Sequence, residues 1–204
     1  MTIRTIIFDA GGVIVRTENL APRDQLAARL GMSREEINDL VFFSETARLA
    51  TLGKLTAQEH WEATRKSLAL PPEIFSTVPA EFFGGDVLDY SLIDYLRSLR
   101  PRYKTALLSN AWDDLRQVVV ERWQVADAFD ELIISAEVGL AKPDPRIYRL
   151  TIDRLGVFPH EAIFVDDVLH NLEAAREVGL NIVHFRSPQQ ACAEVEQMLM
   201  DTPS

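Results

Sequence analysis

The chain has 204 residues, 31 of them acidic and 21 basic, so its formal net charge is −10 at pH 7. Because 47% of the residues are hydrophobic, the chain can bury a core and is not a disordered polyelectrolyte. The acidic balance, with no run of basic residues, argues against a nucleic-acid partner and against a polybasic membrane anchor.

Cysteine content and apolar segments restrict the class of protein further. The single cysteine, Cys192, excludes an intramolecular disulfide and a cysteine-ligated metal. The N-terminus lacks the apolar stretch of a signal peptide, and no window approaches the roughly 20 apolar residues of a membrane span. We therefore expect a cytoplasmic protein that is a monomer or a homodimer and does not bind a membrane.

Short apolar runs alternate with amphipathic segments along most of the chain. The runs predict strands buried on both faces, at 3–8, 103–108, 131–134, 162–165 and 181–185. The amphipathic segments predict helices at 88–100, 112–123, 145–155, 169–178 and 188–200. This alternation predicts an α/β fold with a doubly wound parallel sheet of the Rossmann-like type.

A long segment separates the first two predicted strands. The separation is about ninety residues, far more than a crossover connection needs. The segment 16–86 is predicted to contain helices only, and it has two capping boxes, formed by Ser33 with Glu36 and by Thr56 with Glu59. We therefore predict a core of residues 1–15 and 87–204 with an inserted α-helical cap, residues 16–86.

Polar and glycine residues follow the predicted strands. They are Asp9, Gly11 and Gly12 after the first strand, Ser109 and Asn110 after the second, Lys142 in the loop after the third, and Asp166 and Asp167 after the fourth. In open parallel sheets the reactive cleft lies beyond the carboxyl ends of the strands. Each residue alone has an ordinary explanation as a turn or a helix cap. Their joint placement favours a site.

Three carboxylates at one edge would repel one another unless a cation neutralises them. The candidate ligands are hard oxygens without histidine or cysteine, which selects Mg²⁺. A Mg²⁺ ion held by few carboxylates commonly binds a substrate phosphate as well. The ammonium group of Lys142 and the amides of the glycine loop add positive potential for that phosphate. The residues therefore predict phosphoryl chemistry.

In this order, the segments 9–13, 109–110, 142–143 and 166–167 resemble the four motifs of the haloacid dehalogenase superfamily. The similarity is to the branch with a helical cap between the first and second motifs. The segments LSNAW at 108–112 and FVDDVLHN at 164–171 further resemble the N-terminal phosphatase domain of soluble epoxide hydrolase and related bacterial sugar-phosphate phosphatases. The resemblance covers essentially the whole chain and implies a hydrolase.

The resemblance implies a role for each acidic residue. Asp9 is expected to attack phosphorus and to form an aspartyl-phosphate that water cleaves. Magnesium is expected to bind the Asp9 carboxylate, the Gly11 backbone carbonyl and Asp167, with Asp166 contributing directly or through water. Asn171 is expected either to orient the acidic pair or to be a plain surface residue.

The resemblance also implies the substrate contacts. Ser109 and Asn110 are expected to hydrogen-bond the phosphoryl oxygens, and Lys142 to stabilise the charge on the nucleophile and the transferring group. Gly12 and Trp112 are further candidates for substrate binding. The expected partner is a small phosphorylated molecule.

The sequence departs from the family pattern at Gly11, where many family phosphatases have a second aspartate as general acid and base. We therefore expect a preference for leaving groups of low pKa. The absence of this acid leaves open a metal-independent 2-haloacid dehalogenase. A phosphonate-cleaving enzyme with Lys54 as a Schiff base and a non-catalytic binding domain are further alternatives.

Specificity is expected to come from the cap and from the residues near its hinge. The candidates are Arg16, Thr17, Phe42, Phe43 and Arg48, with Trp112 from the core side. For Phe42 and Phe43, packing inside the cap is the favoured interpretation.

Overall fold

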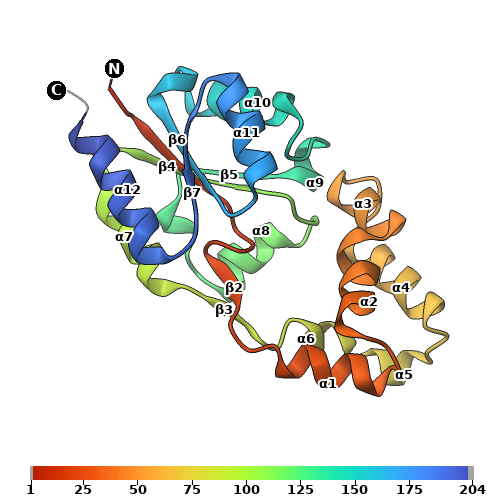
Figure 1. Ribbon diagram of the computed structural model, residues 1–204. Coiled ribbons are helices and arrows are strands. Elements are labelled where there is room, and N and C mark those ends of the chain that lie inside the picture. The colour runs from red at the N-terminus through yellow and green to blue at the C-terminus, as the bar shows by residue number, and fades with distance from the viewer. Residues whose placement is uncertain (1, 202–204) are drawn as a thin grey trace.

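The computed structural model describes residues 2–201 and contains a five-stranded parallel sheet in the order β5-β4-β1-β6-β7 (Figure 1). The strands are β1 (Thr5–Phe8), β4 (Lys104–Ser109), β5 (Glu131–Ile134), β6 (Ala162–Asp166) and β7 (Asn181–His184). Every predicted strand is present within two residues of its predicted ends. The α/β fold with a doubly wound parallel sheet is therefore confirmed.

Helices cover both faces of this sheet. One face carries α7 (Tyr90–Leu99) and α12 (Pro188–Met200), and the other carries α10 (Pro145–Leu155) and α11 (Leu169–Val178) (Figure 1). In β1, Ile6 and Phe8 belong to the first core and Ile7 to the second, as the two-residue period of a strand requires. Burial on both faces explains why the strands read as continuous apolar runs.

The helix α10 shows how local sequence sets these boundaries. Its N-cap residue Asp144 accepts a hydrogen bond from the amide of Arg146, and Pro145 occupies the first turn, where its missing amide hydrogen costs nothing. The helix ends at Gly156, whose φ of 65° is the left-handed conformation that glycine adopts without strain.

Two predicted helices begin later than expected. The helix predicted at 88–100 starts at Tyr90, because Leu88 belongs to a short strand. The segment predicted at 112–123 forms only α8 (Leu115–Gln117), which continues as a π-helix at Val118–Arg122. The remaining short elements are α9 (Ser135–Val138) and 3₁₀ turns at Ala126–Ala128 and Pro159–Glu161.

The long insertion forms a separate group of helices beside the sheet (Figure 1). They are α1 (Ala21–Arg29), α2 (Arg34–Asn38), a π-helix at Asp39–Phe43, α3 (Glu45–Thr51), α4 (Ala57–Ser67), α5 (Pro72–Phe75) and α6 (Val78–Phe82), here called the inserted helices. They bury their own apolar cluster, which includes Leu26, Val41 and Phe82. Both predicted capping boxes are present, at the starts of α2 and α4.

The prediction that 16–86 contains helices only is wrong at both ends. Strands β2 (Val15–Thr17) and β3 (Asp86–Leu88) form an antiparallel pair that joins the inserted helices to the sheet. The Thr17 hydroxyl lies 2.6 Å from an Asp86 oxygen, and Arg16 pairs with Asp89 at 2.8 Å. Strands of three residues are too short to produce a recognisable pattern in the sequence. The proposed division at 16 and 86 stays a prediction.

Within residues 2–201, no helix combines the length and the apolar character that crossing a bilayer requires. The one cysteine, Cys192, is half-buried in α12 and packs against the core.

Candidate active site

The central strand β1 lies between β4 and β6, so the residues that follow these strands meet at one edge of the sheet. Asp9 follows β1, Ser109 ends β4, and Asp166 ends β6. The carboxylates of Asp9, Asp166 and Asp167 offer ligand atoms that all lie within 4.8 Å of one another. The structure thus brings together the acids that the sequence places after separate strands.

The ammonium group of Lys142 lies between two of these acids. Its Nζ is 2.8 Å from Asp9 Oδ1 and 2.7 Å from Asp166 Oδ2, and all three side chains are buried. Burial alone would lower the pKa of Lys142, but the two carboxylates outweigh it and raise the pKa above its usual value. Lys142 is therefore a fixed positive charge beside Asp9.

Asp9 is the acid whose protonation the site alters most clearly. Burial raises the pKa of Asp9 to about 7, against the lowering effect of Lys142 and with a further raising effect from Asp166. Its hydrogen bonds from the Ala10 amide, at 2.6 Å, and from Lys142 both reach Oδ1. Across residues 2–201, no hydrogen bond reaches Oδ2. This second oxygen keeps its lone pairs for a cation or an electrophile.

Asp166 is fully buried and has a complete set of partners. Its Oδ1 accepts from the Val168 amide at 2.7 Å and from Asn171 Nδ2 at 3.2 Å, while Oδ2 accepts from Lys142. The structure thus favours the orienting role for Asn171. Asp167 is more open to solvent, and partial desolvation together with the charge of Asp166 raises its pKa.

The side chain of Asn110 holds the loop that carries Lys142. Asn110 Nδ2 donates to the Lys142 carbonyl oxygen, and Asn110 Oδ1 accepts from the Lys142 amide, both at 2.8 Å. These two hydrogen bonds hold the loop of Lys142 against the end of β4, so the Lys142 ammonium group lies beside Asp9 and Asp166. Contact of Asn110 with a phosphoryl group stays a prediction. The Ser109 hydroxyl is almost buried at the same edge and, among the described residues, makes no hydrogen bond.

Gly12 makes room for one of the acids. Its φ is 78°, and a Cβ atom at this position would overlap the Asp167 carboxylate. The Gly12 amide donates to the Val15 carbonyl oxygen at 2.8 Å, so it is engaged within the loop, and its contact with a substrate stays a prediction. At Gly11, by contrast, a Cβ atom would meet nothing within 4 Å.

The donor set fits a small divalent cation. Three carboxylates and one ammonium group leave a net formal charge of −2 when all are ionised, and the donors are hard oxygens. The close approach that Gly12 allows places Asp167 beside the Asp9 loop. The role of the Gly11 carbonyl as a ligand stays a prediction.

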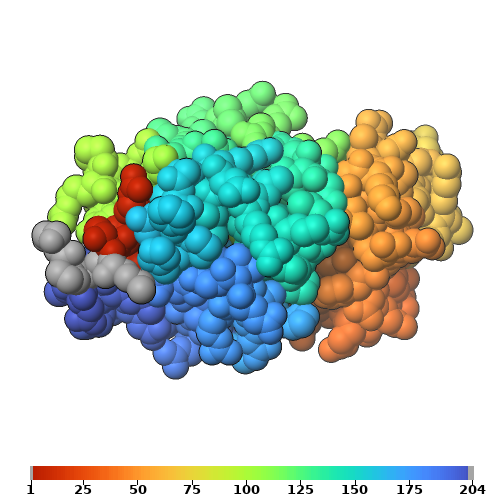
Figure 2. All heavy atoms as spheres, turned by 90° about the horizontal axis from the view of Figure 1, so that it is seen from above, coloured from red at the N-terminus to blue at the C-terminus, as the bar shows by residue number. Residues whose placement is uncertain are grey.

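The inserted helices contact the core through the segment that follows β4. Trp112 lies 4.7 Å from the His60 ring and 5.6 Å from Trp61, between ring centroids. Asp113 accepts a hydrogen bond from the Ala57 amide, at the start of α4, at 2.8 Å. In Figure 2 the inserted helices, in orange, pack directly against the core. Asp113 is not among the residues predicted from the sequence, although its place beside Trp112 is a usable signal.

The other specificity candidates lie in different surroundings. Packing of Phe42 and Phe43 inside the cap is wrong: their side chains are 41% and 77% exposed. Val41 takes the buried position of this π-helical turn, so the next two residues turn outward. Arg48 is exposed, whereas Arg16 and Thr17 lie in β2.

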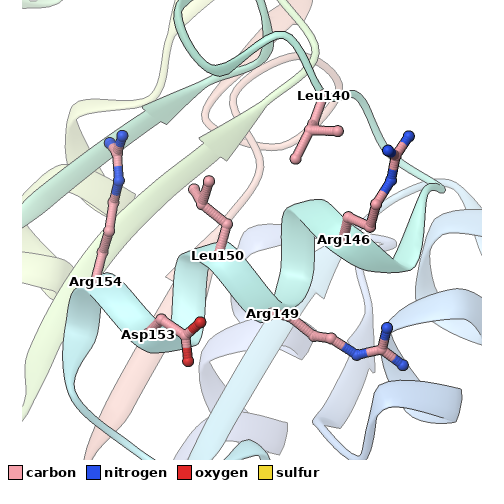
Figure 3. Close-up of a pocket in the computed structure, with 6 residues that line it drawn as sticks. All are labelled: Leu140, Arg146, Arg149, Leu150, Asp153 and Arg154. Carbon is pink, nitrogen blue, oxygen red and sulfur yellow. The ribbon is translucent and has the colours of Figure 1, made fainter.

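A surface hollow of about 540 Å³ lies elsewhere, along α10 (Figure 3). It is lined by Leu140, Arg146, Arg149, Leu150, Asp153 and Arg154. Neither the three clustered acids nor Lys142 lines this hollow, so we do not assign it to the candidate active site.

The chain is similar to several characterised enzymes. It is 29% identical to bifunctional epoxide hydrolase 2 of Sus scrofa, in a match that covers 100% of the chain and 41% of that longer protein. It is 30% identical to D-ribitol-5-phosphate phosphatase of Bacteroides thetaiotaomicron, over 87% of the chain and 89% of that protein. It is 27% identical to (S)-2-haloacid dehalogenase 1 of a Pseudomonas strain, over 90% of the chain and 84% of that protein.

Solved structures show the same fold. The crystal structure of a Bacteroides thetaiotaomicron enzyme in complex with magnesium and inorganic phosphate matches with a TM-score of 0.78 at 23% identity, over 91% of this chain and 96% of that one. The family model of haloacid dehalogenase-like hydrolases matches residues 3–179. The motifs, the fold and this match agree, and the chain belongs to the haloacid dehalogenase-like hydrolases.

Proposed function

We propose that the chain is a Mg²⁺-dependent phosphatase that hydrolyses a small phosphorylated metabolite through an aspartyl-phosphate on Asp9. The observation that carries this proposal is the geometry at Asp9. One carboxylate oxygen is held by the Ala10 amide and Lys142, and the other is without a hydrogen bond beside two further acids. The arrangement orients a nucleophile next to a group of cation ligands.

The chain's residues have defined tasks in this reaction. Asp9 Oδ2 attacks phosphorus, the bond to the leaving oxygen breaks, and water then cleaves the aspartyl-phosphate. Lys142 neutralises charge on Asp9 and on the transferring group, and the Ser109 hydroxyl donates to a phosphoryl oxygen. Bound by Asp9, the Gly11 carbonyl and Asp167, with Asp166 contributing directly or through water, Mg²⁺ would supply Lewis acidity and neutralise the phosphate.

The reaction has no carboxylate at position 11 to protonate the leaving oxygen. A general acid or base contributes about 10² to 10⁴ in rate, whereas enzymes accelerate phosphate-monoester hydrolysis by up to roughly 10²¹. Most of the catalysis is therefore retained. We expect leaving groups of low pKa to react fastest, because they depart with little need of a proton.

A metal-independent 2-haloacid dehalogenase is the second candidate, and the specific observation in its favour is Gly11. Halide departs without a proton, so a second aspartate is not required. The net formal charge of −2 at the acids argues against it, because a haloacid carboxylate would be repelled in the absence of a cation. A domain that binds a phosphate without turnover is the non-enzymatic alternative.

Hydrolysis of p-nitrophenyl phosphate with Mg²⁺ or with EDTA separates these candidates. We expect phosphate release that requires Mg²⁺ and falls by at least about 10⁴-fold in Asp9→Asn, since the nucleophile is lost. Asp153→Asn, an exposed aspartate on α10, is the matched control. Chloride release from (S)-2-chloropropionate in EDTA would support the dehalogenase. The absence of both activities would favour a binding domain.

A further inference from the structure

Resting on the proposed phosphatase function, we propose that the substrate is a phosphate monoester with an apolar leaving group. The contacts would come from a row of five aromatic side chains, here called the aromatic strip. Its members are Trp112, Trp61, Phe83, Phe42 and Phe43, from the core and from the inserted helices.

The aromatic strip is continuous. Successive ring centroids are 5.6 Å apart from Trp112 to Trp61, 6.1 Å from Trp61 to Phe83, 6.1 Å from Phe83 to Phe42, and 6.5 Å from Phe42 to Phe43. These separations are those of rings in contact. The strip therefore presents one connected apolar surface.

Exposure distinguishes the strip from the core beneath it. Phe75 and Phe82 are buried in the inserted helices, whereas Trp112, Trp61 and Phe83 are half-buried. Phe42 and Phe43 are 41% and 77% exposed. Contiguous exposed apolar surface marks binding sites more often than single exposed side chains do. Trp112, Trp61 and Phe83 also pack against the buried cluster of the inserted helices, so the exposed surface of the strip lies mainly at Phe42 and Phe43.

Two members of the strip adjoin segments that lead out of the active site. Trp112 comes two residues after Asn110, whose side chain binds the backbone of Lys142. Farther along the strip, the Arg23 guanidinium lies 5.8 Å from the Phe42 ring centroid, and its Nη2 is 3.3 Å from the Thr17 hydroxyl. Thr17 is in β2, which follows the Gly11 and Gly12 loop. The strip therefore runs along the junction between the inserted helices and the catalytic edge.

The chemistry of the strip selects against polyol leaving groups. Aromatic rings offer apolar surface and, apart from the two indole N–H groups, no strong hydrogen-bond donors. Hydroxyl groups placed against the rings would lose their bonds to water, whereas each methylene group buried there improves binding about four-fold. An alkyl or aryl chain is the leaving group that this surface accommodates.

A series of 4-alkylphenyl phosphates, from methyl to hexyl, tests this inference at nearly constant leaving-group pKa. With Mg²⁺ we expect kcat/KM to rise by about two- to four-fold per methylene. We expect 4-(hydroxymethyl)phenyl phosphate to react more slowly than the 4-ethyl compound. Binding of the corresponding non-hydrolysable 4-alkylphenyl phosphonates, measured by calorimetry, should tighten along the same series.

Phe43→Ser removes the most exposed ring of the strip and should flatten the dependence on chain length. Phe158→Ser is the matched control, because Phe158 is 67% exposed, stacks on His160 and lies outside the strip. A flat series in the wild type, or equal chain-length dependence in the wild type and Phe43→Ser, overturns the inference while Mg²⁺-dependent turnover keeps the proposed function. Absence of turnover for every ester overturns the proposed function and the inference together.

Discussion

The acidic edge of the sheet and the aromatic strip are built in opposite ways. At the edge, Asp9, Asp166 and Lys142 are buried and held by ion pairs of 2.7–2.8 Å. On the inserted helices, Phe42 and Phe43 are 41% and 77% exposed, and their ring contacts are edge-on. The ammonium group of Lys142 is matched by two carboxylates, whereas the rings offer exposed apolar surface.

This difference has a physical cause. A buried charge left without its partner costs several kcal/mol, so side chains at the acidic edge allow few substitutions. An exposed ring carries no such penalty and can be replaced without loss of the fold. We therefore expect substitutions at the acidic edge to change the chemical step and substitutions in the strip to change substrate choice.

Lys142→Met gives the largest effect expected at the acidic edge after loss of the nucleophile in Asp9→Asn. Without the ammonium group, Asp9 and Asp166 face each other with no intervening charge, so we expect kcat to fall by about 10²–10³-fold and the metal-free fold to lose about 3 kcal/mol. Steady-state kinetics and urea unfolding measure the two effects. Lys54→Met, at an exposed lysine in the turn between α3 and α4, should change neither. Loss of activity in Lys54→Met would instead revive the phosphonate-cleaving alternative.

Gly12→Ala and Gly11→Ala form a matched pair in one loop. A Cβ atom at Gly12 overlaps the Asp167 carboxylate, while at Gly11 it meets nothing within 4 Å. We expect Gly12→Ala to weaken Mg²⁺ binding by about 10–100-fold and Gly11→Ala to leave it nearly unchanged, as measured by calorimetry. Equal Mg²⁺ affinities in the two variants would contradict the assignment of Asp167 as a ligand.

Asn110→Ala removes the side chain that holds the backbone of Lys142 but leaves every charge at the acidic edge in place. The loss of two hydrogen bonds to the Lys142 backbone should reduce kcat by up to about 30-fold, since each bond contributes roughly 1 kcal/mol. Asn181→Ala is the control, because Asn181 also makes two backbone contacts, to His160 and Ala162, away from the acids. A kcat in Asn110→Ala equal to that of Asn181→Ala would remove the positioning role.

The dependence of stability on pH is the smallest effect expected. Burial raises the pKa of Asp9 from 3.8 to about 7, so in this window the folded chain binds its proton more tightly than the unfolded chain does. Stability of the metal-free protein therefore falls as pH rises through the window. Because Mg²⁺ binds the ionised carboxylate, it should reduce this fall.

Thermal unfolding in EDTA and in Mg²⁺ across this pH range measures that dependence. We expect Tm in EDTA to drop as pH rises through this window and to drop less in Mg²⁺. In Asp9→Asn the part of the slope due to Asp9 should disappear. The same slope in the wild type and in Asp9→Asn would show that other groups determine it.

The sheet and the clustering of the acids could be predicted from sequence because both follow from strand pattern. The strand ends bring Asp9, Ser109 and Asp166 together once β1 lies between β4 and β6. The short strands β2 and β3 could not be predicted, since three residues show no period. The Asn110 contact was hidden as well, because it joins two loops that are distant in the chain.

The exposure of the aromatic strip could not be predicted from the sequence either. An apolar residue in a helical segment is more often core than surface, so the sequence predicts that Phe42 and Phe43 pack inside the cap. In the π-helical turn Asp39–Phe43 it is Val41 that is buried, so Phe42 and Phe43 lie on the exposed side. Tertiary packing determines which of these residues is buried, and the local sequence does not show it.

The most direct test of the central claim is acid quenching during turnover of p-nitrophenyl phosphate, followed by peptide mass spectrometry. We predict a mass increase of one phosphoryl group on the peptide that contains Asp9, present with Mg²⁺ and absent with EDTA and in Asp9→Asn. Accumulation of nitrophenol in a rapid burst while the Asp9 peptide stays unmodified would contradict the aspartyl-phosphate and the role given to Asp9.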